Sequence, residues 1–134
     1  NTQIHGITAT DVKNMPTFPS IWAELKGYLN NNIVLAHNAS FDMSVLKSIL
    51  NTYNLEKPNF KYYCTVSLAK KVWPELENHK LNTLASYFNI NFKHHNALHD
   101  SKVCAMVAVL ATRKLNSKNF AQLITKLNLK DNKF

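Results

Sequence analysis

The fold class is decided by the stretch IVLAHNASFD, residues 33–42. Its first four residues form a short, continuous apolar run, which is typical of a buried strand in a parallel or mixed sheet. An apolar stripe at helical spacing follows from about Ser40, so a helix should begin directly after the strand. Ligands of α/β folds bind beyond the carboxyl ends of strands, and the polar residues 37–42 are well placed for such a site.

Outward from this stretch, apolar spacing predicts the order helix, strand, helix, strand and then four helices, after a loop over residues 1–19. Ser20 is expected to cap the first helix. The inner face of that helix comprises Ile21, Trp22, Leu25, Tyr28 and Leu29. The other predicted elements are a helix from near Ser40 with inner residues Val45, Leu46, Ile49, Leu50 and Tyr53, a strand over 60–66, a helix ending near Trp73, a helix over 81–88, a helix over about 97–115 and a last helix with Phe120, Leu123, Ile124 and Leu127. The pattern is α/β with few strands, because two strands do not make a stable sheet by themselves.

The 134-residue chain carries a net charge of +8, with a pI near 9.6. The surplus is concentrated in residues 68–134, which hold eleven Lys and Arg against four acids, whereas residues 1–67 hold five Lys against four acids. Such a surplus favours a polyanionic partner, either nucleic acid or an acidic membrane surface. The length fits one domain.

The cysteines, Cys64 and Cys104, are too few for a disulfide framework, and their apolar neighbours predict buried free thiols. The sequence shows no signal peptide and no apolar run long enough to cross a bilayer. We therefore expect a cytoplasmic protein without a membrane partner. The chain begins with Asn1 rather than Met, so we also expect that sequence upstream has been removed or omitted.

Three places hold polar residues that packing does not explain. At residues 37–42, Asp42 would lie in the first turn of its helix, where capping or stabilisation of the helix dipole is the alternative to a catalytic role. At the start of the long helix, His95, His99 and Asp100 have a spacing that permits a metal site, and the alternative is that His94 and His99 are simply solvated.

The third place is HGIT, residues 5–8, where a glycine permits either close approach of the backbone to a ligand or an ordinary turn. Together the three places resemble the DnaQ-like 3′–5′ exonucleases of the DEDDh class, nearest the bacterial DNA polymerase III epsilon (proofreading) subunits and their homologues. The resemblance covers residues 4 to about 112. It rests on four segments in family order, His5-Gly6-Ile7-Thr8, Ala36-His37-Asn38-Ala39-x-Phe41-Asp42, His79-x-Leu81 and His95-x-Ala97-x-x-Asp100.

The resemblance implies a ribonuclease-H-like fold and removal of nucleoside monophosphates from DNA 3′ ends, single-stranded or frayed, by a two-metal mechanism with Mg²⁺ or Mn²⁺. It assigns metal binding to Asp100 and Asp42, and the general base that deprotonates the attacking water to His95. It assigns substrate binding to His5, Gly6, Ile7, Thr8, His37, Asn38 and Phe41. A DNA polymerase subunit is the implied protein partner. These residues do not separate proofreading, repair and RNA 3′ trimming.

One motif of the family is missing, because its first two acids come as Asp-x-Glu on the first strand and no Asp-x-Glu occurs here. We therefore expect a mostly helical single domain over 1–134 that lacks its N-terminal strands, with a core over about 1–115 and a C-terminal helix and tail over 116–134. The chain is then either a fragment of a complete exonuclease or a descendant that lost the motif. In both cases we expect it to be inactive alone, because two carboxylates do not fix two hard cations.

Two other classes of function stay open. A non-catalytic nucleic-acid-binding module descended from an exonuclease would use the basic second half and ignore the carboxylates. An interaction domain would dock the apolar stripe of its last helix on a polymerase or helicase, although packing of that stripe on its own domain is the expected arrangement.

Overall fold

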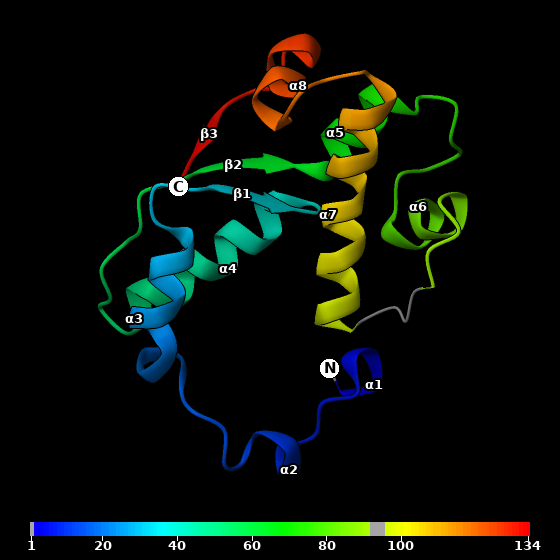
Figure 1. The fold of residues 1–134 in the computed structure, drawn as a ribbon. Helices are drawn as coiled ribbons and strands as arrows, with labels where there is room; N and C mark the ends of the chain where they lie inside the picture. Colours follow the sequence, from blue (N-terminus) through cyan, green and yellow to red (C-terminus); the bar gives the residue numbers. More distant parts are fainter. Residues whose placement is uncertain (1, 92–95) are drawn as a thin grey trace.

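A small sheet organises the computed structural model, which describes residues 2–91 and 96–134 (Figure 1). Strand β1 (Ile33–Ala36) lies parallel to β2 (Lys61–Cys64), and β3 (Asn132–Lys133) lies antiparallel to β2. The strand order within the described residues is β1-β2-β3. The register pairs Ala36 with Cys64, so β1 and β2 end at the same edge of the sheet.

Both predicted strands are confirmed. The second is shorter than the predicted range 60–66, because Thr65 and Val66 already belong to the helix that follows. The sequence does not predict β3, because two polar residues give no periodic signal.

The predicted order of the larger helices is confirmed, and two short helices precede them. Their bounds are α1 Thr2–His5, α2 Ala9–Val12, α3 Phe18–Leu29, α4 Ala39–Thr52, α5 Thr65–Val72, α6 Leu81–Tyr87, α7 Ala97–Lys114 and α8 Phe120–Leu127. None of these helices combines the length and the apolar character that crossing a membrane requires, as far as the described residues go.

The prediction of a loop over residues 1–19 is wrong, because α1, α2 and the start of α3 lie there. Helix α2 exists because Thr8 and Asp11 form a reciprocal capping box: the Thr8 hydroxyl accepts from the Asp11 N–H at 3.3 Å, and the Asp11 carboxylate accepts from the Thr8 N–H at 2.8 Å. A cap of this kind stabilises a single turn that has no apolar stripe.

Helix α3 begins before the predicted Ser20 cap, because Pro19 at the start of the helix has the φ angle that a first turn requires. Ser20 instead donates its hydroxyl to the Thr17 carbonyl at 2.6 Å. Of the predicted inner face only Trp22 is buried, whereas Ile21 is 40% exposed and Tyr28 is 70% exposed. The prediction of a continuous buried stripe is therefore wrong here.

Helix α4 buries Ala39, Met43 and Leu50. Of its predicted stripe, Leu50 is buried and Leu46 and Ile49 are partly buried, whereas Val45 and Tyr53 are about half exposed, at 50% and 49%. The buried face of α4 therefore begins at Ala39, the first residue of the helix. That placement leaves Asp42 at the margin of the face, near the sheet edge.

The core lies where α5, α6, α7 and α8 pack together beside β2. In Figure 1 β1 and β2 point toward α5 and α7, and α8 lies on the opposite side of the sheet from α4. The buried cluster comprises Tyr63, Leu68, Ala69, Val72, Trp73, Leu84, Val107, Ala108, Ala111, Leu123 and Leu129. The expectation that the last helix packs on its own domain is confirmed, since Leu123 is fully buried in this cluster.

Asparagines supply the left-handed backbone positions that turns and helix ends require. Among the described residues the non-glycine positions with positive φ are Asn31, Asn38, Asn54, Asn89, Asn116 and Asn128. Asparagine tolerates this conformation better than other side chains, because its short amide bonds to the local backbone. Asn38, with φ of 66°, makes the sharp turn from β1 into α4.

We predict that Leu123→Ala lowers the free energy of unfolding by about 2–5 kcal/mol, because it leaves a cavity where α8 meets the core. Urea unfolding followed by circular dichroism measures this. Leu98→Ala is the matched control, since Leu98 is 60% exposed and its truncation should change the free energy by less than about 0.5 kcal/mol. Equal effects of the two variants would contradict the packing of α8 described above.

The last strand is held by Asp131, whose carboxylate accepts from Lys61 Nζ at 2.6 Å and from the Tyr63 hydroxyl. The hydrogen bond from Lys61 and then that from Tyr63 lower the pKa of Asp131, whereas burial and the neighbouring carboxylate raise the pKa of Tyr63 to about 12. A depressed carboxyl pKa contributes stability above the unfolded value of 3.8, and that contribution is lost as pH falls through the folded value.

We therefore predict that Asp131→Asn unfolds at a lower urea concentration than the unmodified chain at neutral pH, and that the difference shrinks as the pH falls below 3.8. Urea midpoints across the acid range measure the effect. Glu77→Gln, at an exposed site, serves as the control. A difference that stays constant across that range would show that the Asp131 contacts do not carry it.

Candidate active site

A cavity of about 330 Å³ lies at the carboxyl end of β1, where α4, α6 and α7 begin. We call it the Asp42–Asp100 cavity. It is lined by Leu35, Ala36, His37, Asp42, Leu81, Ala97, Asp100, Ser101 and Cys104. Segments far apart in the sequence therefore meet at the place where the strand–helix junction predicts a site.

Two acidic side chains face this cavity from equivalent positions, because Asp42 is the fourth residue of α4 and Asp100 is the fourth residue of α7. The first turn of a helix favours negative charge, since its free N–H groups carry partial positive charge. Asn96 fixes the start of α7, as its side-chain oxygen accepts from the His99 N–H at 3.2 Å. The two carboxylates that the sequence singles out thus line one cavity.

The two carboxyl groups have different surroundings. The Asp42 side chain is exposed, yet partial loss of solvent around its carboxyl raises its pKa, against the effect of a hydrogen bond from its own backbone N–H. Asp100 Oδ1 is buried and has no hydrogen-bond partner among the described residues. A buried polar oxygen without a partner is costly, and a bound cation would satisfy it. These oxygen ligands therefore suit a hard divalent ion.

His37 ties β1 to the loop before α6. Its Nε2 lies 2.9 Å from the His79 carbonyl and its Nδ1 lies 2.9 Å from the Thr65 hydroxyl. Since a carbonyl only accepts, Nε2 carries the proton and Nδ1 accepts from the hydroxyl in the neutral ring. Burial lowers the pKa of His37 and so favours the neutral ring. The hydrogen bond to the His79 carbonyl and the charge of Asp100 act in the opposite direction.

Sequence reasoning missed Thr65, which is fully buried and connects three segments. Besides its bond to His37, its hydroxyl lies 3.5 Å from Cys104 Sγ. Burial raises the pKa of the Cys104 thiol, and the negative charge of Asp42 adds to this. One feature of the sequence could have indicated its role: Thr65 directly follows β2, just as His37 directly follows β1, and the parallel register places the two residues side by side.

Among the described residues, the predicted site residues His5, Gly6, Ile7, Thr8, Asn38 and Phe41 do not line this cavity. His5 is the last residue of α1, and residues 6–8 form the exposed segment between α1 and α2; the His5 ring accepts from the Ile7 N–H at 3.0 Å, and Gly6 has φ of 73°. Phe41 is 65% exposed on α4. His95, the predicted general base, lies outside the described residues.

A larger groove of about 720 Å³ adjoins the cavity, and we call it the Lys70–Lys80 groove. Its lining comprises His37, Asn38, Val66, Lys70, Glu77, Asn78, His79, Lys80, Leu81 and Asn82. His37 and Leu81 line both spaces, so the groove and the Asp42–Asp100 cavity share a wall. Asn38, a predicted substrate residue, belongs to the groove.

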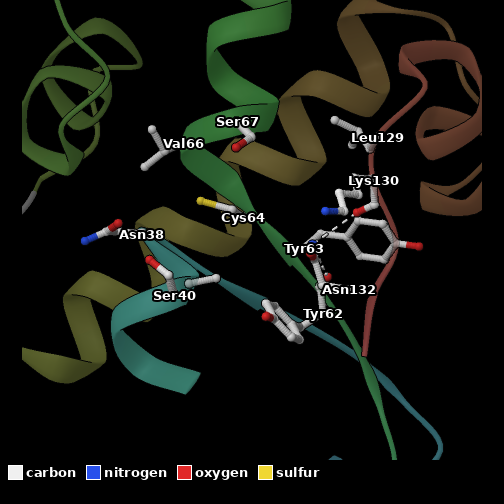
Figure 2. Close-up of a pocket in the computed structure, with 11 residues that line it drawn as sticks. Asn38, Ser40, Tyr62, Tyr63, Cys64, Val66, Ser67, Leu129, Lys130 and Asn132 are labelled. Carbon is white, nitrogen blue, oxygen red and sulfur yellow. Dashed lines mark hydrogen bonds between the residues drawn. The ribbon is translucent and has the colours of Figure 1, made fainter. Parts of the chain in front are cut away.

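Figure 2 shows a third space, of about 390 Å³, which we call the Cys64 pocket. Asn38 and Ser40 lie on one side of it and Leu129 and Lys130 on the other, with Cys64 between them. The lining comprises Asn38, Ala39, Ser40, Tyr62, Tyr63, Cys64, Val66, Ser67, Leu129, Lys130 and Asn132. The pocket lies where β2 ends, beside the first turns of α4 and α5.

The prediction of two buried thiols is right for Cys104 and wrong for Cys64, which is half-buried. Burial acts to raise the pKa of Cys64, but hydrogen bonds from four backbone N–H groups outweigh it and lower the pKa below its usual range. These groups lie around the starts of α4 and α5, because the parallel register brings both helix ends to this residue. They belong to Ser67, Ala39, Val66 and Asn38.

Comparison with known proteins identifies the family. The sequence pattern of the exonuclease family (RNase T) matches residues 1–108, most of the chain. The chain belongs to the exonuclease family. Exonucleases of this family use divalent metal ions, in keeping with the oxygen ligands at the cavity. Within residues 2–91 and 96–134, however, no three His, Cys, Asp or Glu side chains come together as a metal site.

Proteins similar to this chain include DNA polymerase III proteins. The chain is 32% identical over 117 residues to the DNA polymerase III PolC-type of Oceanobacillus iheyensis, covering 87% of the chain and 8% of that protein. It is 33% identical over 117 residues to the DNA polymerase III subunit epsilon of Buchnera aphidicola, covering 82% of the chain and 47% of that protein. The chain thus spans less than a tenth of the first relative and about half of the second.

The fold is also that of a solved exonuclease. The structure of Exonuclease X in complex with 5′ overhanging duplex DNA superposes with a TM-score of 0.69 at 23% identity, covering 94% of this chain and 71% of that one. The predicted α/β, ribonuclease-H-like and mostly helical fold class is therefore confirmed.

For this exonuclease chain we predict that Asp100→Asn weakens Mn²⁺ binding by more than about tenfold, since even groups that only orient metal ligands typically contribute 10–100-fold. Titration of Mn²⁺ followed by electron paramagnetic resonance measures free ion directly and needs no substrate. Asp11→Asn is the control, because Asp11 lies in the capping box of α2. Equal binding by Asp100→Asn and the unmodified chain would exclude Asp100 as a ligand.

Proposed function

We propose that this chain is the 3′–5′ exonuclease domain of a protein that removes nucleoside monophosphates from DNA 3′ ends, in proofreading or repair. The observation that carries the proposal is the convergence of Asp42 and Asp100 on one cavity, with a buried Asp100 oxygen that lacks a partner in the described part of the chain. Family membership supplies the reaction class, and the two acids supply the metal chemistry.

In this proposal Asp42 and Asp100 hold the divalent ions, Mg²⁺ or Mn²⁺, through carboxylate oxygens. Such ions, two in the complete site, would make bound water a better nucleophile and offset negative charge on the phosphate. The raised pKa of Asp42 makes this ligand sensitive to acid, because the protonated carboxyl binds cations poorly.

The proton and the substrate are handled by other residues. His95 takes the proton of the attacking water, the new P–O bond forms, and the bond from phosphorus to the 3′ oxygen of the preceding nucleotide breaks; that oxygen keeps the electron pair and gains a proton from solvent to become the new 3′ hydroxyl. His37 uses both ring nitrogens within the protein, so its part is to hold the cavity wall beside the substrate. The exposed Ile7 and Phe41, at 51% and 65%, offer apolar surface to a nucleobase.

His5, Gly6, Thr8 and Asn38 complete the proposed substrate contacts, and residues 1–134 act as a single exonuclease domain. We propose a DNA polymerase subunit as the partner and the cytoplasm as the location, because the similar proteins include DNA polymerase III PolC-type and the epsilon subunit of DNA polymerase III. DNA is favoured over RNA on the same ground.

We propose that the 134 residues alone do not hydrolyse DNA. Two carboxylates leave most positions around two hard cations without protein ligands, and no Asp-x-Glu is present to add to them. The edge of β1 opposite β2 has no strand paired to it within the described residues, so that edge is free to pair with a further strand.

A non-catalytic nucleic-acid-binding or polymerase-interacting domain is the second candidate. The net charge of +8 and the shortage of metal ligands in the described residues favour it. Such a domain would bind DNA equally well after loss of both carboxylates, whereas the exonuclease depends on them.

To test catalysis, the chain is joined behind the Asp-x-Glu-bearing strands of an active family member. We predict that this fusion shortens 3′-labelled single-stranded DNA with Mg²⁺ and releases nucleoside monophosphates. Replacement of the proposed base, His95→Ala, should slow release by about 10²–10⁴-fold, the usual contribution of a general base. Product release followed by chromatography measures the rate.

The control is Lys57→Ala, at an exposed site that lines none of the three spaces described above, which should leave the rate within about twofold of the fusion, well short of the loss of a general base. A folded fusion that binds DNA without shortening it would overturn the exonuclease proposal. Hydrolysis by the 134-residue chain alone, abolished by His95→Ala, would overturn the proposed inactivity.

A further inference from the structure

Three spaces adjoin one another along the edge where β1 and β2 end. The Asp42–Asp100 cavity shares His37 and Leu81 with the Lys70–Lys80 groove, and the groove shares Asn38 and Val66 with the Cys64 pocket. Because neighbouring spaces share lining residues, the three lie in a row along this edge, and we call this row the path. The acidic cavity stands at one end of the path and the Cys64 pocket at the other.

Beyond the acidic cavity the path is lined by free positive charge. Lys70, Lys80 and Lys130 line it and are exposed. None of their ammonium groups has an acidic partner in the part of the chain that the structure describes, unlike Lys26 and Lys61, which pair with carboxylates. Among the described residues, Glu77 is the one acid that lines the groove or the pocket. The charge of these two spaces therefore favours an anion.

The uncharged lining suits a nucleic-acid strand. Asn78 uses its side-chain oxygen to accept from the Lys80 N–H at 3.1 Å and the Thr83 hydroxyl at 2.6 Å, which leaves its amide N–H groups to donate outward. Tyr62 presents an aromatic ring to the Cys64 pocket. Basic side chains that follow a backbone, together with aromatic rings on which bases stack, are the usual means of binding single strands.

We propose that the Lys70–Lys80 groove and the Cys64 pocket bind the single strand that leads to the 3′ end, with Lys70, Lys80 and Lys130 contacting its phosphates. The proposal rests on the proposed function, which places the terminal nucleotide in the Asp42–Asp100 cavity. The preceding nucleotides then pass beside His37, which lines both that cavity and the Lys70–Lys80 groove.

The test is equilibrium binding of a fluorescent oligothymidylate of about twelve nucleotides, in EDTA so that no hydrolysis occurs. The variant K70Q/K80Q/K130Q should bind about 100-fold more weakly at about 0.05 M salt, and the slope of log K against log salt should fall by about 2, because each contact to a single strand contributes about 0.7. The control K57Q/R113Q/K118Q removes the same charge from residues that line none of the three spaces. It should lower the slope by less than about 0.5.

Acetylation of lysines, followed by mass spectrometry, gives a readout that does not depend on variants folding. Bound oligonucleotide should protect Lys70, Lys80 and Lys130 in the unmodified chain and leave Lys57 and Lys118 reactive. Equal losses of affinity in the two triple variants, or equal protection of all five lysines, would overturn the path. Failure of the fusion to hydrolyse DNA while the path still binds it would overturn the proposed function alone.

Discussion

The parallel pairing of β1 with β2 is the constraint on which the rest of the structure depends. Because Ala36 lies opposite Cys64, the two strands end together, and the helices that follow them begin at one edge of the sheet. His37 then meets Thr65 at 2.9 Å, and Thr65 in turn reaches Cys104 on α7. A shift of the register by one residue would turn the side chains of β1 to the opposite face and separate these groups. The register of β1 and β2 therefore positions the starts of α4 and α5 and connects them to α7.

The acids at that cavity bring an electrostatic cost that the fold does not remove by itself. The first turns of α4 and α7 offset part of the negative charge, since each carboxylate lies near a helix start. Asp100 Oδ1 still lacks a partner in the described residues, and a buried oxygen without one destabilises the folded chain. Sites of this kind persist where function requires them, because selection for stability alone would favour a neutral or paired side chain. The same feature that weakens the fold therefore supports the catalytic proposal.

Local sequence patterns predicted the elements whose burial follows their own periodicity. They failed where contacts with residues far away in the sequence determine the structure. The apolar run of β1 and the stripe of α7 are predictable because burial follows their own periodicity. On α3 the periodic Ile21 and Tyr28 are exposed, since no segment of the described chain covers them. Thr65 gave no pattern, because its role arises from residues far away in the sequence. The last strand depends likewise on Asp131 bonding across to β2. The motif acids were predictable by resemblance, whereas the pairing that brings them together was not visible in their spacing.

The separation of charges along one edge of the sheet has a consequence for how metal and nucleic acid bind. Two carboxylates without a cation repel a phosphate, whereas the free lysines beyond His37 attract one. On the proposed assignment a strand is held by its preceding phosphates even when no ion is present, but its terminal phosphate enters the Asp42–Asp100 cavity only once positive charge neutralises the acids. By linkage, the strand must then raise the affinity for the ion by the same factor as the ion raises the affinity for the terminal nucleotide. On this assignment the basic path and the acidic cavity are two parts of one binding equilibrium. The ions are retained best when a 3′ end occupies the Asp42–Asp100 cavity.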